Sequence, residues 1–184
     1  MMPENEHGKK AEGKIKEWLH RPDDGYSFDR IPDQVTGMYG SSNICDFELY
    51  KYPHKYYIES KCTYNDNIPF SCLTNKQRDG LMLKSQIKGS YGFVIVLFQS
   101  YKRAFVFNIQ DIAELIDTEA SLLELDKRLN KSETLSQLKI KSLNIKKIAK
   151  WPIPYKEIRT IPNNRKEFLD YEGEIEEYIP KELS

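Results

Sequence analysis

The stretch "YYIESKC", Tyr56–Cys62, places an acid and a base two residues apart inside a run that otherwise has the composition of a buried strand. Successive side chains of an extended strand point to opposite faces, so Glu59 and Lys61 project together while Ile58 and Ser60 point the other way. The acid and the base therefore form either a small polar site on one face of the predicted sheet or part of a solvated polar face on which they pair loosely.

A second apolar run, "ICDFELY", precedes this stretch and is joined to it by "KYPH", so the two runs predict a β-hairpin. Proline cannot donate to a strand ladder, so Pro53 belongs in the turn. A turn centred between Tyr52 and Pro53 places Asp46 directly opposite Glu59. Because two facing carboxylates repel, we expect a positive charge between them. Lys61 is one source, and Mg²⁺, which prefers oxygen ligands, is another.

Helices are predicted on both sides of the hairpin in the sequence. Residues 9–19 carry apolar side chains at helical spacing, and Glu12 lies at the edge of that stripe, either beside the core or in solvent. Thr74 followed by Gln77 fits a capping box and predicts a helix that begins at Asn75. The runs "YGFVIVLF" and "AFVFNI" predict a buried central strand and its neighbour. This order indicates an α/β fold with a mixed sheet built around the hairpin.

Composition limits the class of protein. The length of 184 residues suits one domain, which we place at residues 1–170, followed by an acidic C-terminal tail at residues 171–184. No apolar run reaches the roughly 18 residues of a membrane helix, and no signal core is visible, so we expect a cytoplasmic protein without a membrane partner. The three cysteines lack metal-binding spacing. The 28 basic and 28 acidic residues balance, but leaving out the glutamate-rich tail makes the remainder net basic.

A set of polar residues on these predicted elements matches a known pattern: Glu12, Asp46, Glu59, Ser60, Lys61 and Gln77. With thirteen positions from Asp46 to Glu59, the set resembles the PD-(D/E)xK nuclease superfamily, which implies a restriction-endonuclease-like core of helix, mixed sheet, helix and strand. Within that superfamily the chain is most similar to the RecU-type Holliday junction resolvases of Gram-positive bacteria and their phages, over roughly residues 5 to 170. The proline of the motif is replaced by Cys45.

The resemblance implies a metal site for Mg²⁺ or Mn²⁺. Asp46 and Glu59 would coordinate the ion, Glu12 would contribute directly or through a bound water, and the backbone carbonyl of Ser60 would be a further ligand. Mg²⁺ keeps several waters, so few protein ligands suffice.

Two further catalytic residues are implied by the same resemblance. Lys61 would position or help to deprotonate the attacking water, and Gln77 would orient Lys61 or the phosphate. The reaction would leave 5′-phosphates at two symmetric nicks in a four-way DNA junction, in recombination and repair. Paired nicks imply a homodimer, for which the apolar parts of residues 109–129 are a candidate interface.

DNA contacts are expected from basic and hydroxyl side chains that the predicted elements place around the carboxylates, since such groups bind phosphates. These candidates are Lys9, Lys10, Arg30, Ser41, Ser42, Lys76 and Arg78. Two alternatives to a junction resolvase stay open at this point. One is a restriction-like or repair endonuclease that cuts linear duplex DNA, and the other is a catalytically silent nucleic-acid-binding module.

Overall fold

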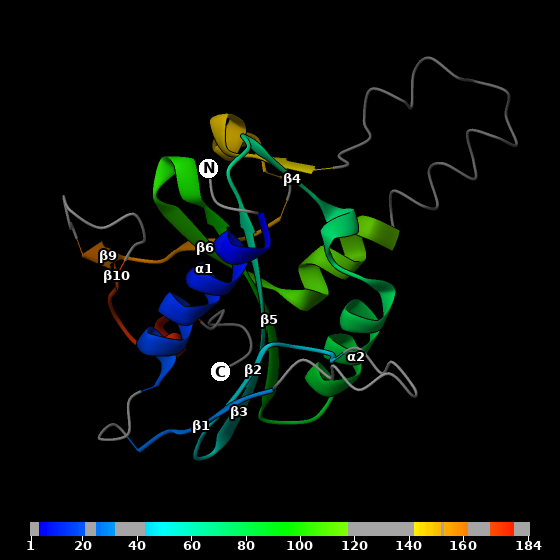
Figure 1. Ribbon diagram of the computed structural model, residues 1–184. Helices are drawn as coiled ribbons and strands as arrows, with labels where there is room; N and C mark the ends of the chain where they lie inside the picture. Colours follow the sequence, from blue (N-terminus) through cyan, green and yellow to red (C-terminus); the bar gives the residue numbers. More distant parts are fainter. Residues whose placement is uncertain are drawn as a thin grey trace, which may run out of the picture.

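A mixed six-stranded sheet is the centre of the computed structural model, which describes residues 4–20, 25–31, 43–117, 142–151, 153–161 and 170–178. The order across the sheet is β1-β2-β3-β5-β6-β8. Figure 1 labels β1, β2, β3, β5 and β6 of this sheet. The strands are β1 Ser27–Arg30, β2 Phe47–Lys51, β3 His54–Thr63, β5 Ser90–Phe98, β6 Arg103–Asn108 and β8 Lys156–Glu157. Only β3 and β5 pair in parallel within this sheet, and the other neighbours are antiparallel. The predicted mixed sheet is confirmed.

Strands β2 and β3 form the predicted hairpin, with the turn at the predicted position. The ladder ends at the pair Phe47–Ile58, and Asp46 lies in a bend just before β2. The N–H of Asp46 donates to the carbonyl of Ile58 at 3.0 Å, although Ile58 already opposes Phe47. Asp46 and Phe47 thus both face Ile58, as in a β-bulge. A bulge changes the direction in which a side chain points. Contrary to the prediction, Asp46 is not paired with Glu59, and its carboxylate reaches Ser60 instead.

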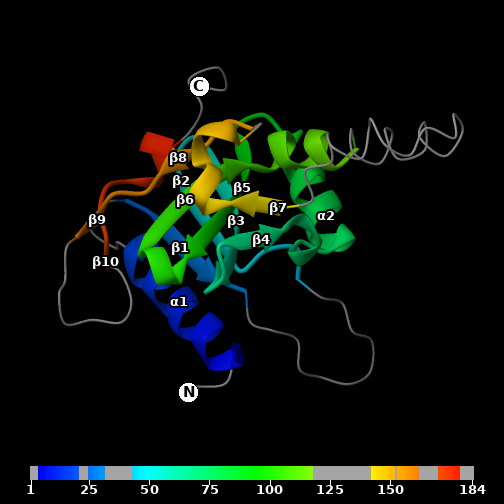
Figure 2. The ribbon, with the colours of Figure 1, turned by 90° about the horizontal axis from the view of Figure 1, so that it is seen from above.

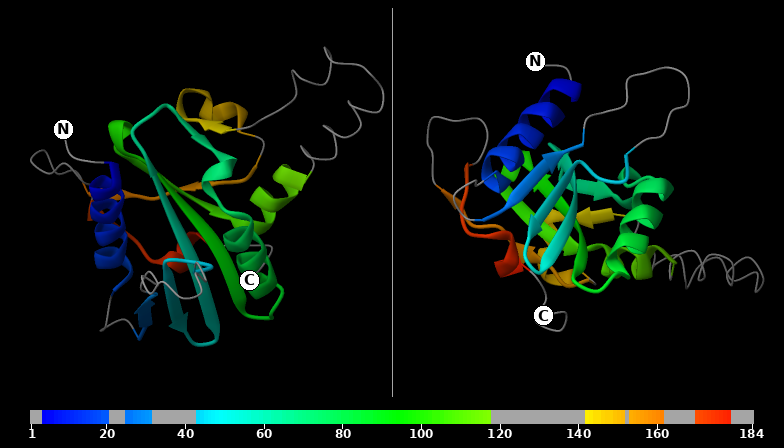
Figure 3. Two further views of the ribbon diagram at one scale, coloured as in Figure 1. Left: turned by 45° about the vertical axis from the view of Figure 1, so that its right-hand side comes forward. Right: turned by 90° about the horizontal axis from the view of Figure 1, so that it is seen from below.

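Helices cover both faces of the sheet (Figures 2 and 3). Helix α1 spans Glu4–Leu19, so it begins earlier than the predicted residue 9. Its predicted apolar stripe is buried against β2, β3 and β5 and consists of Ala11, Ile15, Trp18 and Leu19. Helix α2, Asn75–Ser85, lies on the opposite face together with a helix over residues 109–117. Within the described ranges, no helix combines the length and apolar character that crossing a bilayer needs.

Strand β5 contributes to two hydrophobic cores, one on each face of the sheet. All nine residues of Ser90–Phe98 are buried. Because side chains alternate along a strand, Phe93 and Ile95 enter the core under α1, whereas Val94 and Val96 enter the core under α2.

Short strands and 3-10 helices complete the fold. They are β4 Asn67–Pro69 paired with β7 Ser142–Asn144, β9 Thr160–Ile161 paired with β10 Asp170–Tyr171, and 3-10 helices at Phe70–Cys72, Gln99–Tyr101, Ile145–Lys150 and Ile175–Tyr178. Residues 171–178, the described part of the predicted acidic tail, pack on the core. Tyr171 and Ile175 are buried with the apolar face of α1, and the indole N–H of Trp18 donates to the carbonyl of Gly173 at 2.9 Å.

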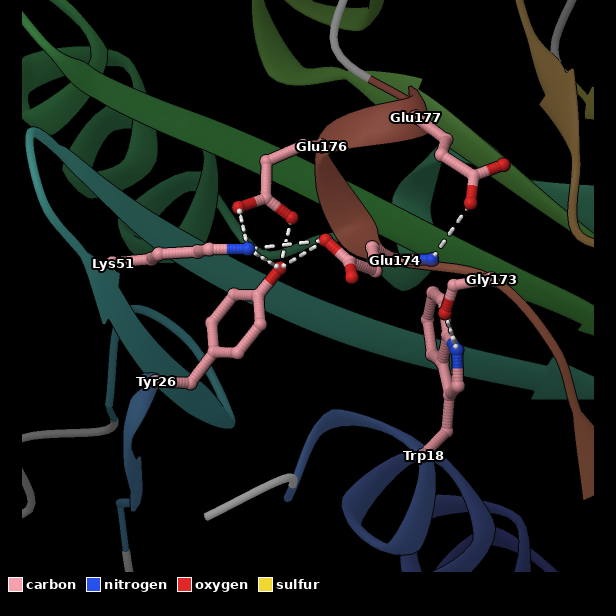
Figure 4. A network of polar contacts seen from close by, with 7 residues as sticks. All are labelled: Trp18, Tyr26, Lys51, Gly173, Glu174, Glu176 and Glu177. Carbon is pink, nitrogen blue, oxygen red and sulfur yellow. Dashed lines mark hydrogen bonds and ion pairs between the residues drawn. The ribbon is translucent and has the colours of Figure 1, made fainter. Parts of the chain in front are cut away.

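The acids of this C-terminal segment hold the turn end of the hairpin (Figure 4). The ammonium of Lys51 lies 3.1 Å from Glu174 and 3.2 Å from Glu176. The hydroxyl of Tyr26 donates to both carboxylates, and burial, followed by the nearby Glu176, raises the pKa of Tyr26. These glutamates therefore neutralise a lysine at the end of β2 that is remote from Asp46.

Candidate active site

Glu59 and Lys61 project from β3 toward α2, as the alternation of the strand predicts. The side chain of Glu59 is 2% exposed, and its Oε1 lies 2.6 Å from Nζ of Lys61. Its other oxygen, Oε2, is buried and accepts no hydrogen bond from the described residues. Burial, and then the charge of Asp46, raise the pKa of Glu59 to about 7, while Lys61 acts in the opposite direction. The ionised carboxylate is thus poorly compensated by the protein, and a further cation would stabilise it.

Gln77 joins helix α2 to this pair. Its Nε2 donates to Glu59 Oε1 at 2.5 Å, and its Oε1 accepts from Lys61 Nζ at 3.4 Å. The capping box places Gln77 here, because it makes Gln77 the third residue of the first helical turn. The structure therefore brings together three of the predicted catalytic residues.

Asp46 reaches the same motif from the position just before β2. Its Oδ2 accepts the backbone N–H of Ser60 at 2.8 Å and the hydroxyl of Ser60 at 2.7 Å. These two hydrogen bonds hold the carboxylate beside the middle residue of the Glu59–Lys61 segment. The N–H and the hydroxyl of Ser60 are thus the groups that bind Asp46. The role of the Ser60 carbonyl as a metal ligand stays a prediction.

Glu12 approaches from helix α1. Its charge contributes to the raised pKa of Glu59, so it lies within electrostatic reach of the site. Its Oε1 lies 2.6 Å from Nη2 of Arg30 on β1. Arg30, which sequence reasoning assigned to DNA, therefore also neutralises the acid on α1.

The other predicted DNA contacts are less closely tied to the carboxylates. The exposed ones are Lys9, Lys10 and Lys76. The guanidinium of Arg78 lies 2.9 Å from Asp79 and 3.7 Å from Asp117, so its charge is shared with two acids. Ser41 and Ser42 lie outside the described residues.

The donor set fits a divalent cation held by few protein ligands. Among the described residues, no group of three or more His, Cys, Asp or Glu side chains converges closely enough to form a metal cluster. Glu59 nevertheless offers a buried carboxylate oxygen without a hydrogen bond, next to the charge of Asp46. Hard oxygen donors of this kind suit Mg²⁺ or Mn²⁺, which retain waters in their coordination shell.

Thr74 is not among the site residues that the sequence predicts. Thr74 was recognised as a helix cap, but it also hydrogen-bonds the side chain of Gln77. The Thr-x-x-Gln spacing was the available signal, and only the fold shows that this glutamine faces Glu59.

The arrangement defines a class of protein. The site has an acid and a lysine two residues apart on a central strand, and an aspartate just before the neighbouring strand. A glutamate on the preceding helix and a glutamine on the following helix complete the pattern that the resemblance to the PD-(D/E)xK nucleases predicts. A family model described as Recombination protein U matches residues 33–161, most of the chain. The chain therefore belongs to the RecU family.

No curated protein sequence matches the chain. Among solved structures, the chain is similar to Hjc, a Holliday junction resolvase from the archaeal hyperthermophile Archaeoglobus fulgidus, with 17% sequence identity, a TM-score of 0.41, and coverage of 56% of this chain and 78% of that one.

Proposed function

We propose that this RecU-family nuclease is a divalent-metal-dependent endonuclease that resolves four-way DNA junctions by paired nicks. The observation that carries the proposal is the closed contact among Glu59, Lys61 and Gln77, which joins the central strand to α2 at the buried carboxylate. A catalytically silent module has no need of a buried acid whose second oxygen lacks a hydrogen bond, because such a group costs stability.

Metal binding is assigned to the acids. Asp46 and Glu59, with Glu12 and the carbonyl of Ser60 as further ligands, would hold Mg²⁺ or Mn²⁺, whose chemistry is to lower the pKa of a bound water and to offset charge on the scissile phosphate. The bulge at Asp46 aims this carboxylate toward Ser60, and the β3 strand fixes the position of Glu59. Glu59 thus comes from β3, and Asp46 comes from the residue just before β2, the neighbour of β3 in the sheet.

Lys61 and Gln77 have positioning roles. An ammonium has three donors, and the contacts of Lys61 with Glu59 and Gln77 use two of them. Among the described residues these are its two hydrogen-bonded partners, so the third donor would orient a water for in-line attack or bind a phosphate oxygen. The side chain of Lys61 is 19% exposed, so solvent and substrate reach it. Gln77 holds the lysine and the acid in one geometry.

DNA is the partner of this site, and the exposed Lys9, Lys10 and Lys76 are proposed to contact phosphates around it. Two symmetric nicks require a homodimer. Residues 109–117, the described part of the candidate interface, bury Ile109 and Ile112 in the protein's own core, so these two side chains do not supply the contact. Sedimentation equilibrium at micromolar concentration should give the mass of a dimer, and a strict monomer would contradict this part of the proposal.

The decisive experiment compares cleavage of a labelled four-way junction and a matched linear duplex in Mg²⁺ or EDTA. We expect paired nicks on the junction in Mg²⁺ alone, and loss of cleavage in Glu59→Ala. The control is Glu157→Ala, which removes an exposed acid that pairs with Arg103 at 2.5 Å on β8, the edge strand at the opposite end of the sheet from β1. This variant should cut normally. Nicks that DNA ligase reseals without kinase treatment would establish 5′-phosphate products.

The remaining outcomes are also informative. Equal cutting of the linear duplex would keep the nuclease and remove the junction selectivity. Junction binding without cleavage by the wild type in Mg²⁺ and in Mn²⁺ would favour the silent module and overturn the proposed activity.

A further inference from the structure

Thr74 makes three hydrogen bonds to Gln77. The backbone N–H and the hydroxyl of Thr74 both donate to Gln77 Oε1 at 3.1 Å, and the backbone N–H of Gln77 donates to the hydroxyl of Thr74 at 3.2 Å. Gln77 Oε1 is the same atom that accepts from Lys61 Nζ. The oxygen of one amide is therefore shared by the helix cap and the candidate active site.

These contacts fix which end of the amide faces the acid. With Oε1 directed at Thr74 and Lys61, the NH₂ group is directed at Glu59, to which it donates at 2.5 Å. The reversed amide would place N–H donors against the N–H of Thr74 and an ammonium, and would place an oxygen against a carboxylate. Both reversed contacts are repulsive, so Thr74, Lys61 and Glu59 together select a single orientation.

We propose that Thr74 is a positioning residue of the nuclease site. Its hydroxyl and N–H hold the Gln77 amide in the orientation that fixes Glu59 and Lys61. This inference rests on the proposed function for its catalytic consequence. In an ordinary capping box, the two side chains only satisfy backbone N–H groups at the start of the helix. Here the glutamine of the box also reaches Glu59, a residue 18 positions earlier in the chain and on a different element.

The competing explanation is that Thr74 only stabilises helix α2. The chain offers a matched control in Asn108, whose Oδ1 accepts the N–H of Gln110 at 2.9 Å at the start of the helix over residues 109–117. Asn108→Ala removes a cap of the same kind at the start of a different helix. Thr74→Val keeps the shape of the side chain and removes its hydroxyl, and Thr74→Ser keeps the hydroxyl.

The first test measures single-turnover cleavage of a four-way junction at a temperature at which every variant is folded. We expect Thr74→Val to cut about tenfold more slowly, as misplaced catalytic groups cost rate, and Thr74→Ser to cut within about twofold of the wild type. Asn108→Ala should lose as much stability as Thr74→Val and cut at the wild-type rate. The inference is overturned if Thr74→Val, like Asn108→Ala, loses stability but cuts at the wild-type rate.

A double-mutant cycle separates positioning from capping. The Gln77→Ala variant keeps the backbone N–H that Thr74 caps but has no amide to position. Thr74→Val should therefore slow cleavage in the wild-type background and have no further effect on rate in Gln77→Ala, although it destabilises both proteins. An equal fold-change in the two backgrounds would show that Thr74 acts independently of the amide and would refute the inference.

A measurement without activity tests the same contact. In ¹⁵N-labelled protein, the side-chain NH₂ signals of Gln77 should be well dispersed and slow to exchange with solvent, and Thr74→Val should make them fast. If the wild type fails to cut but this change is seen, the positioning role stands and the proposed function falls. Unchanged Gln77 signals in Thr74→Val would overturn the positioning role whatever the nuclease does.

Discussion

At the scale of the residue, the main feature of the candidate site is the buried carboxylate of Glu59. Glu59 is 2% exposed, pairs with Lys61 through one oxygen, and leaves its other oxygen without a hydrogen bond among the described residues. Desolvation raises its pKa to about 7, so its ionised form is disfavoured in the folded protein without metal. The same group is therefore a burden on stability, and a cation beside it would relieve that burden.

This burden predicts a pH dependence of stability. The pKa of Glu59 is higher in the folded protein than in the unfolded chain, so its contribution is fully present below the unfolded value of 4.5 and is lost as pH rises through about 7. From pH 4.5 to pH 8 in EDTA, the free energy of unfolding should fall by up to about 3 kcal/mol on account of this group. Urea unfolding at both pH values measures the change.

The matched variant for this prediction is Glu59→Gln, which keeps the shape and cannot ionise. Other titrating groups affect both proteins alike, so the difference between the two pH profiles isolates Glu59. The profile of the variant should be flatter between pH 4.5 and pH 8. Parallel profiles would show that Glu59 titrates at its ordinary pKa and is not desolvated as described.

At the scale of the element, the site depends on how closely helix α2 approaches the segment before β2. Gly80 permits this approach, because a Cβ at Gly80 would lie 2.4 Å from Cγ2 and 2.8 Å from Cβ of Ile44. The contact is close to the branch point of Ile44, which cannot move aside without its backbone. A glycine that weakens the helix on its own thus allows α2 to bring Gln77 to β3.

Gly80→Ala should therefore destabilise the protein, even though alanine is the better helix former. Overpacking of this kind costs about 1–3 kcal/mol, more than the gain in helix propensity of about 1 kcal/mol. The control is Gly13→Ala in helix α1, where an added Cβ meets nothing within 4 Å. That variant should gain about 0.5–1 kcal/mol. Thermal unfolding of both variants checks the two signs, and a stabilised Gly80→Ala would refute the close contact.

Sequence patterns predicted the elements well where local chemistry decides them. The Thr74 capping box marked the start of α2, the alternation of β3 put Glu59 and Lys61 on one face, and the run now seen as β5 was assigned to the sheet centre. Local patterns did not show the bulge at Asp46, since it depends on pairing at the end of a ladder. They also missed the ion pair of Arg30 with Glu12, whose partners meet only when β1 packs beside α1.

At the scale of the whole molecule, the acidic composition of residues 171–184 suggested a tail, and sequence reasoning had no means to see its packing. Charge dominates this stretch, but the described part buries Tyr171 and Ile175 in the core under α1. Its glutamates bind Lys51. Such long-range contacts join opposite ends of the chain and leave no periodic signal. The segment thus fixes α1, the helix that presents Glu12.

Trp18→Phe should loosen this contact while keeping an aromatic ring. The variant loses the hydrogen bond to the carbonyl of Gly173, and we expect a loss of about 1 kcal/mol in stability. The control is Trp151→Phe, which removes a similar bond of 2.8 Å to the carbonyl of Asn144 in the core under α2. Both variants should lose stability, but only Trp18→Phe should speed amide hydrogen exchange in residues 170–178. Equal exchange in the two variants would contradict the assigned role of Trp18.

The bond between Trp18 and Gly173 also orders events in time, since its two partners are 155 residues apart in the chain. As the protein is synthesised, α1 leaves the ribosome long before the segment that latches it, and contacts of such long separation form late in folding. The hairpin and β5 are available much earlier. The nascent chain therefore carries Asp46, Glu59 and Lys61 on a forming sheet before the acidic segment can dock against the helix that carries Glu12.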